Sequence, residues 1–145
     1  MKISTKGRYA LRLMIDLAEH RSEGYVSLAA VAERQGVSKK YLEQIIPVLT
    51  RAGLLRTVRG AQGGYALAKD PEKCSVGEIL CLTEGSLAPV DCAAEDPPRC
   101  ARAGVCPTLP IYKGLYKVIN DYLNGISLAD VLSGAREQAI DNYSI

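Results

Sequence analysis

Apolar residues recur every three or four positions through much of this chain, which is the spacing of one face of an α-helix. The first such face is formed by Ala10, Leu13, Met14, Leu17 and Ala18. A second, shorter helix is predicted to begin at Leu28 and to end at a turn at Gly36. A third is capped by Ser38 and ends at Gly53. The pattern therefore predicts three consecutive helices, with a tight turn between the second and the third.

Two strands and a further helix follow the third helix. Residues 54–59 and 64–68 are predicted to be strands joined by a glycine-rich turn. Ser75 and Glu78 have the spacing of a capping box, which opens a helix that ends at Gly85. The first part of the chain thus ends with a hairpin and a helix.

The second part has an irregular segment and then the longest helix. Residues 86–105 show no period, and three prolines exclude a long helix there; a loop of this length in a small domain is more often functional than accidental. Residues 109–124 are predicted to form the longest helix, and Ser127 to cap a last short one. Residues 135–145 are expected to be a loosely held tail.

The longest helix carries two apolar stripes. One has the alternating steps of a coiled-coil seam and comprises Tyr112, Leu115, Ile119, Tyr122 and Ile126. The other comprises Ile111, Tyr116, Val118 and Leu123. Because one small domain cannot easily cover both, we interpret the first stripe as the seam of a homodimer. The alternative is a helix buried wholly within its own subunit.

These elements predict a mainly α-helical fold with a small β wing, namely a winged helix-turn-helix plus a long C-terminal dimerisation helix. Residues 1–85 would form the winged helix-turn-helix domain, and residues 86–106 a cysteine-bearing sensor loop. Residues 107–134 would hold the dimerisation helix and the short closing helix, and residues 135–145 the tail.

Charge is unevenly divided along the chain. Residues 1–69 hold 12 Lys and Arg against 5 Asp and Glu, whereas residues 70–145 hold 6 against 11. A basic N-terminal half is expected where phosphate is bound, although an ordinary solvated basic surface would look the same. A single histidine, no glycine-rich phosphate loop after a strand and no paired acids at metal-ligand spacing argue against an enzyme. Without an N-terminal apolar signal or a bilayer-spanning run, we expect a cytoplasmic protein without membrane association.

The third helix has the side chains of a helix that reads the DNA major groove. Ser38 and Tyr41 can donate to phosphate at its N-terminus, and Lys39 and Lys40 add positive charge there. Farther along, Gln44 can pair with an adenine edge. Glu43 can accept a hydrogen bond from a cytosine amino group, but it repels phosphate.

The hairpin is suited to the minor groove. Arg59 at its tip fits a narrow minor groove, and Gly60, Gly63 and Gly64 would let the backbone approach DNA closely. Taken alone, the glycines indicate only a hairpin turn. Next to Arg59 and the helix pair, we interpret them as part of a DNA-binding wing.

The five cysteines fall into two groups. Cys92, Cys100 and Cys106 lie in or at the edge of the irregular segment, where three thiolates on adaptable backbone suit an iron–sulfur cluster or zinc. Cys74 and Cys81 are interpreted as small half-buried residues. The only histidine, His20, ends the first helix and is expected to be an exposed polar residue rather than a metal ligand.

Four motifs together resemble one family of winged-helix transcriptional regulators, typified by IscR, NsrR and CymR. The motifs are Ile3–Ala10, Ser38–Gln44, Val58–Tyr65 and Ser75–Glu78, and the similarity continues through Ile126–Asp130. The resemblance implies a repressor that dimerises through its long helix, with each subunit reading half of a near-palindromic operator. It also implies that Glu43 helps to discriminate between operator classes.

In IscR and NsrR three cysteines of the corresponding loop bind a cluster, usually 2Fe–2S, and the resemblance carries this role to Cys92, Cys100 and Cys106. The fourth ligand differs here, because Leu109 replaces the histidine of IscR-like proteins and Arg8 replaces the acid of NsrR-like proteins. The candidates are Asp91, Glu95, Asp96, Thr108, another thiol or a small exogenous molecule.

Two alternatives keep the DNA reader and change the signal. The chain could act as a CymR-like regulator of cysteine metabolism through a partner enzyme of cysteine biosynthesis. It could instead sense zinc or thiol oxidation without a cluster.

Overall fold

The computed structural model describes the backbone of residues 1–143 and the side chains of residues 1–138. Its winged part contains helices α1 (Thr5–Glu19), α2 (Leu28–Gln35), α3 (Lys39–Arg51) and α4 (Val76–Glu84) and strands β1 (Leu55–Val58) and β2 (Gly64–Leu67). The rest contains α5 (Asp91–Ala94), α6 (Leu109–Asn124) and α7 (Leu128–Tyr143). Short 3-10 turns lie at Arg21–Glu23, Pro71–Lys73 and Ala103–Val105.

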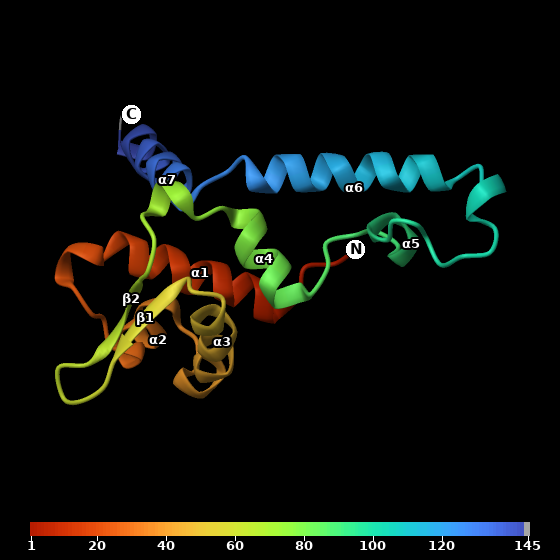
Figure 1. The fold of residues 1–145 in the computed structure, drawn as a ribbon. Helices are drawn as coiled ribbons and strands as arrows, with labels where there is room; N and C mark the ends of the chain where they lie inside the picture. Colours follow the sequence, from red (N-terminus) through yellow and green to blue (C-terminus); the bar gives the residue numbers. More distant parts are fainter. Residues whose placement is uncertain (144–145) are drawn as a thin grey trace.

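Helix α1 lies at the centre of the winged part. In Figure 1, α2, α3 and the hairpin lie on one side of it, and α6 and α7 on the other. The apolar face predicted for α1 is buried against an apolar face of α3. The central residues of the two faces, Leu13, Met14, Leu42, Ile45 and Leu49, are at most 1% exposed. Burying one such side chain contributes about 1.5–3 kcal/mol. This shared core holds the helix-turn-helix against α1.

The start of each helix in the helix-turn-helix is capped by a serine, as predicted for Ser38; the cap at Ser27 was not predicted. The hydroxyl of Ser27 accepts from the amide of Ala30 at 3.2 Å. The hydroxyl of Ser38 accepts from the amide of Tyr41 at 3.1 Å. Such a cap contributes about 1 kcal/mol and ties the helix start to a specific residue.

The hairpin forms with the expected strands in antiparallel register, pairing Leu55 with Leu67 and Val58 with Gly64. A backbone bridge between Val26 and Tyr65 attaches β2 to the segment before α2. The wing is therefore joined to the helix-turn-helix by main-chain hydrogen bonds.

The capping box at the start of α4 is only half formed. The hydroxyl of Ser75 accepts from the amide of Glu78 at 3.0 Å, but the Glu78 carboxylate instead accepts from the Lys69 ammonium at 2.9 Å. By contrast, Ser127 and Asp130 form a complete box at the start of α7, with distances of 2.8 and 3.0 Å. The spacing is the same at both sites, but at α4 the acidic side chain pairs with Lys69 instead of the backbone amide of Ser75.

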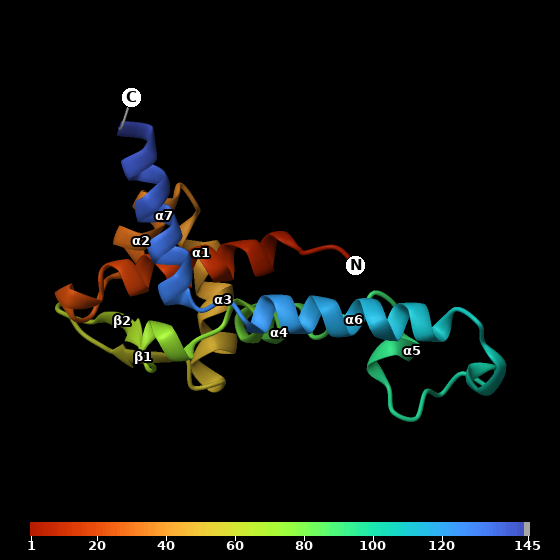
Figure 2. The same ribbon diagram turned by 90° about the horizontal axis from the view of Figure 1, so that it is seen from above.

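Helix α6 projects beyond the winged part, with α5 near its far end, as Figures 1 and 2 both show. Its C-terminal end is anchored to the start of α4 by a backbone bridge between Ser75 and Ser127 and by a contact between the Ser75 hydroxyl and Asn124 Oδ1 at 3.1 Å. One side of α6 and the residues just after it pack on α4 and the following segment. The packed residues are Tyr116, Ile119, Leu123 and Ile126, against Val76, Leu80 and Leu87.

The opposite side of α6 is bare in the single chain, and it differs from the predicted seam. Tyr112, Leu115 and Tyr122 of that seam are exposed, but Ile119 and Ile126 pack within the subunit. The largest exposed side chains on the bare side are Ile111 (65%), Leu115 (46%), Val118 (64%) and Tyr122 (67%). These four residues, here called the outer stripe, also have heptad spacing. The prediction mixed two faces because both satisfy the same spacing rule.

The last helix is longer than expected. Residues 135–143, predicted to be a tail, continue α7, and Gly134 lies within that helix. An isolated glycine costs only about 1 kcal/mol in a helix interior, so it need not end the helix. Residues 144–145 of the predicted tail lie outside the described residues.

The irregular segment 86–105 is confirmed in outline. It contains only the single-turn helix α5 and the 3-10 turn at Ala103–Val105. Neither turn is long enough to show a hydrophobic period, which is why the sequence pattern did not predict them.

Candidate functional site

The recognition helix α3 presents a polar face to solvent. Its predicted DNA-contacting residues Ser38, Lys39, Lys40, Glu43 and Gln44 are all exposed, and Tyr41 is half-buried. Because the apolar side of α3 is packed in the core, these polar side chains have only the outer face available. The helix therefore has the orientation that major-groove reading requires.

A groove of about 550 Å³ lies between the first turn of α2, the outer face of α3 and the hairpin. Of the ten predicted DNA-contacting residues, six line it: Lys39, Glu43, Arg59, Gly60, Gly63 and Gly64. The other four, Ser38, Lys40, Tyr41 and Gln44, are not part of its lining. The fold thus brings the wing and one side of α3 together, while the N-terminal turn of α3 forms a separate surface.

The groove also contains residues that the sequence analysis missed. Ser27 and Ala29 come from the start of α2, and Thr57 and Val58 come from β1. Val58 is an exposed apolar side chain, which is a type that can contact a thymine methyl group. For Thr57 and Val58 the only signal was the alternation along the strand, which does not indicate which side faces α3. For Ser27 and Ala29 nothing in the sequence indicated that the start of α2 lies beside the hairpin.

Two of the wing glycines are required by the fold itself. A Cβ atom on Gly63 would collide with the carbonyl oxygen of Val58, and one on Gly64 would collide with that of Val26. The close approach that explains these two glycines is therefore between segments of this chain. Arg59 is exposed in the same hairpin.

The charges on α3 are weakly paired. Lys39 Nζ lies 3.9 Å from Glu43 Oε1, and both side chains are more than half exposed. Exposed pairs of this kind contribute only about 0–1 kcal/mol. Both groups can therefore turn to a ligand in the groove at little cost.

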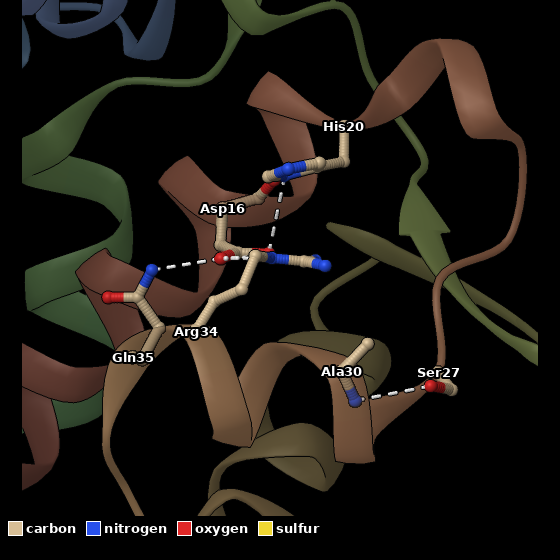
Figure 3. A network of polar contacts seen from close by, with 6 residues as sticks. All are labelled: Asp16, His20, Ser27, Ala30, Arg34 and Gln35. Carbon is tan, nitrogen blue, oxygen red and sulfur yellow. Dashed lines mark hydrogen bonds and ion pairs between the residues drawn. The ribbon is translucent and has the colours of Figure 1, made fainter.

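A buried carboxylate lies behind the helix-turn-helix (Figure 3). Asp16 of α1 is only 1% exposed, and Arg34 at the end of α2 approaches both of its oxygens, at 2.7 and 3.1 Å. Gln35 donates to the same carboxylate at 2.9 Å. Burial alone would raise the pKa of Asp16, but the hydrogen bonds from Arg34 and Gln35 outweigh it, so this pKa lies below its ordinary value. The ionised carboxylate fixes α2 against α1.

His20 is part of this region rather than an exposed residue. It is 23% exposed, and its Nδ1 lies 2.8 Å from the backbone oxygen of Asp16. The sequence showed its position at the helix end, but not that its ring folds back onto the preceding turn.

The three candidate ligand cysteines lie on the segment between α4 and α6. Cys92 is half-buried in α5, Cys100 is exposed, and Cys106 is half-buried just before α6. Cys106 Sγ lies 3.3 Å from the Thr108 hydroxyl. This contact, with the backbone amides of Thr108 and Leu109, lowers the pKa of the Cys106 thiol.

The remaining two cysteines have different surroundings. Cys74 is buried in the core, and burial raises the pKa of its thiol to about 11. Cys81 on α4 is exposed. The expectation that both are half-buried was therefore wrong, because Cys74 precedes α4 and packs in the main core, whereas Cys81 lies on α4 away from its buried residues.

The thiols of the segment suit a soft metal or an iron–sulfur cluster in kind, but they are not gathered. Across the residues that the structure describes, no three His, Cys, Asp or Glu side chains come close enough together to hold a metal ion. Of the fourth-ligand candidates, Glu95 is held by Arg99, whose amide and guanidinium lie 2.9 and 3.4 Å from its oxygens. A site at these cysteines would have to assemble when its metal binds.

No helix among the described residues has both the length and the apolar character needed to cross a bilayer.

Comparison with known proteins identifies the family. The family model Rrf2, described as "Iron-dependent Transcriptional regulator", matches residues 3–134. Protein rrf2 of Nitratidesulfovibrio vulgaris is 42% identical over 135 residues, covering 93% of this chain and 89% of that protein. The transcriptional regulator IscR of Aliivibrio salmonicida is 37% identical over 142 residues, covering 98% of this chain and 83% of that protein.

Solved structures agree with these relatives. T. potens IscR is 45% identical, with a TM-score of 0.77 and coverage of 95% of this chain and 90% of that chain. CymR, described as the global cysteine regulator of B. subtilis, is 37% identical, with a TM-score of 0.70 and coverage of 92% and 97%.

These matches confirm the predicted fold class, mainly α-helical with a small β wing. The relatives are named as transcriptional regulators, which also confirms that the chain is not an enzyme. With its recognition helix and wing facing one groove, the chain belongs to the Rrf2 family of DNA-binding transcriptional regulators, whose model is described as iron-dependent.

Proposed function

We propose that the chain is a homodimeric repressor whose binding to a near-palindromic operator responds to an iron–sulfur cluster or to redox state at Cys92, Cys100 and Cys106. The observation that carries this proposal is the position of α6 between the cysteine-bearing segment and the winged part. One side of α6 packs on the winged part, the outer stripe is bare, and the helix begins three residues after Cys106. A single helix thus connects the cysteines, an apolar surface and the DNA reader.

The outer stripe supports dimerisation. Four large apolar side chains in a row on one helix face form a contiguous exposed patch, which in soluble proteins marks an interaction surface. Their heptad spacing suits packing against a second copy of the same helix. A twofold dimer would present two recognition helices, as a near-palindromic site requires.

For DNA reading, we assign the major groove to α3. Ser38, Lys39, Lys40 and Tyr41 would contact phosphates near its N-terminus. Glu43 and Gln44 would contact base edges. The wing, with Arg59 at the tip and Gly60, Gly63 and Gly64 beside it, would enter the adjacent minor groove.

For sensing, Cys92, Cys100 and Cys106 would supply three thiolates to a 2Fe–2S cluster. When bound, such a cluster supplies a group that can be oxidised, reduced or lost. The lowered pKa of Cys106 favours the thiolate form that metal binding requires. The family description as iron-dependent supports iron over zinc. Because the three thiols start apart, metal binding would order the segment that leads into α6.

The test is anaerobic purification followed by absorption spectroscopy and analysis for iron, sulfide and zinc. Wild-type protein is expected to be coloured and to contain iron and sulfide. Cys92→Ala, Cys100→Ala and Cys106→Ala should each lose the cluster, and Cys81→Ala is the matched control that should keep it. Colourless, iron-free protein after chemical reconstitution would contradict the cluster, and bound zinc would favour a zinc sensor.

A second candidate is a CymR-like regulator that responds to cysteine supply through a partner enzyme of cysteine biosynthesis. The separation of the three thiols and the similarity to CymR along 97% of that chain favour it. If it is correct, adding such an enzyme should change operator binding equally in wild-type protein and in the Cys→Ala variants. No change with the enzyme, together with a cluster in the wild type, would reject it.

A further inference from the structure

A chain of side-chain contacts leads from the first turn of α3 into α1. The rings of Tyr41 on α3 and Tyr9 on α1 meet edge to face, with centroids 5.4 Å apart and an angle of 90° between the ring planes. This geometry is the favoured one for an aromatic pair, and it restrains both rings. Tyr41 is therefore held by a residue outside the helix-turn-helix.

The face of Tyr9 carries a cation. The guanidinium carbon of Arg12, one turn farther along α1, lies 5.4 Å from the centroid of the Tyr9 ring. The same guanidinium donates from Nε to the Gln35 side-chain oxygen at 3.0 Å and from Nη2 to the Gln35 backbone oxygen. Arg12 thus joins the aromatic pair to the last residue of α2.

This chain of side-chain contacts ends at the buried carboxylate of Asp16. Gln35 uses its oxygen for Arg12 and its Nε2 for Asp16, at 2.9 Å, so both ends of its amide are engaged. Asp16 is in turn held by Arg34, as Figure 3 shows. Asp16 is only 1% exposed and accepts three hydrogen bonds, so this end of the chain of contacts is firmly held.

We propose that Tyr9 and Arg12 are positioning residues for DNA binding, which hold the Tyr41 ring so that its hydroxyl meets a phosphate at the start of α3. The inference rests on the function proposed above, in which Tyr41 contacts DNA. A tyrosine free to rotate must be ordered when DNA binds, and this cost is avoided if the free protein already holds it. Helix α1, which lies outside the helix-turn-helix, thereby contributes to the affinity of the recognition helix.

The decisive variant is Arg12→Met, which keeps the aliphatic length and removes the guanidinium. Arg12 is exposed, so the variant should fold, and its melting temperature is measured first. Arg8→Met is the matched control, because Arg8 is also an exposed arginine of α1 and makes none of these contacts. The probe is a labelled duplex selected from a randomised pool by the wild-type protein, with binding followed by fluorescence anisotropy at several salt concentrations.

Arg12→Met is expected to weaken binding about 2- to 10-fold per half-site, the range for ordering one side chain. The salt dependence of Arg12→Met should match that of the wild type, since no phosphate contact is lost. Arg8→Met should weaken binding less than Arg12→Met does. In a Tyr41→Phe background, which keeps the ring but lacks the hydroxyl, Arg12→Met should cause no further loss. Tyr9→Leu should behave like Arg12→Met in both backgrounds.

Three outcomes separate the possibilities. An equal loss from Arg12→Met with and without the Tyr41 hydroxyl, with a salt slope lower by about one, would show that Arg12 contacts phosphate directly and would overturn the proposal. Unchanged affinity of both Arg12→Met and Tyr9→Leu would overturn it as well. If the wild-type protein selects no duplex at all, the proposed function fails instead.

Discussion

In the winged part, Leu13, Leu42 and Leu49 are almost fully buried, whereas on α6 the similarly large Ile111, Val118 and Tyr122 are about two-thirds exposed. The same contrast holds for polar groups. Asp16 accepts three hydrogen bonds from side chains of α2. The cysteines that precede α6, by contrast, belong to no group of three His, Cys, Asp or Glu side chains among the described residues that could hold a metal ion. The winged part buries its large apolar side chains within one chain, whereas α6 leaves the outer stripe exposed. We infer that the region of α5 and α6 is the one that a further component would complete.

The largest expected effect comes from the outer stripe. Replacing Leu115 and Val118 together by glutamate should convert the proposed dimer to a monomer and reduce operator binding by orders of magnitude, because two linked half-sites become separate. Light scattering and anisotropy measure the two effects. Lys113→Ala together with Lys117→Ala is the control on the same helix. A wild type that is already monomeric at micromolar concentration would remove the basis of the comparison.

The next largest effect is expected at the buried Arg34–Asp16 pair of the winged part. Arg34→Ala leaves the Asp16 carboxylate buried with fewer partners, and should lower the free energy of unfolding by about 2–3 kcal/mol. This lies below the roughly 3–5 kcal/mol of a fully buried pair, since a third of Arg34 is exposed. Denaturant unfolding measures it, with Arg21→Ala as an exposed control.

The same variant should have a characteristic pH dependence. Because the pKa of Asp16 in the folded protein lies below its ordinary value of 3.8, its pairing stabilises the wild type fully above that value. This stability is lost as the pH falls through the lower folded-state pKa. The gap between wild type and Arg34→Ala should therefore be widest near neutral pH and should narrow in acid. A gap that stays constant down to acid pH would show that the pair acts through packing alone.

A smaller effect is expected at the wing. Arg59→Ala should weaken operator binding by about 1–3 kcal/mol per half-site if the side chain enters the minor groove. Stability should not change, since Arg59 is exposed and the glycines around it hold the turn. Identical affinities for Arg59→Ala and wild type at all salt concentrations would exclude the wing contact.

The smallest change in affinity is expected at Glu43. Glu43→Ala removes one hydrogen-bond acceptor and one charge that repels phosphate, so binding to the best site should hardly weaken. The range of accepted sites should broaden instead. Selection from a randomised duplex pool measures this, and Lys39→Ala, which removes its weak ion-pair partner, is the comparison. An unchanged sequence preference would reject a selectivity role.

Much of the winged part could be predicted from the sequence, because its signals are local. The hydroxyl of Ser38 caps α3 through an amide three residues away, and the apolar period of α1 coincides with its buried side. The candidate DNA-reading face followed from the same period, since the polar residues of α3 lie opposite its buried ones. Contacts across the chain left no such signal, and the role of Gln35 between Arg12 and Asp16 is an example.

By itself, the sequence determined the order of the long helices and the two strands, the helix starts at serine caps such as Ser38, and the residues available on α3 and the hairpin. Those properties depend on neighbours within about four residues along the chain. Only the tertiary structure decided that Ile119 packs inward while Leu115 stays bare, that Glu78 binds Lys69 rather than completing its box, and that Gly64 is required by Val26. In each case the neighbours along the chain leave the outcome open, and contact with a distant segment decides it.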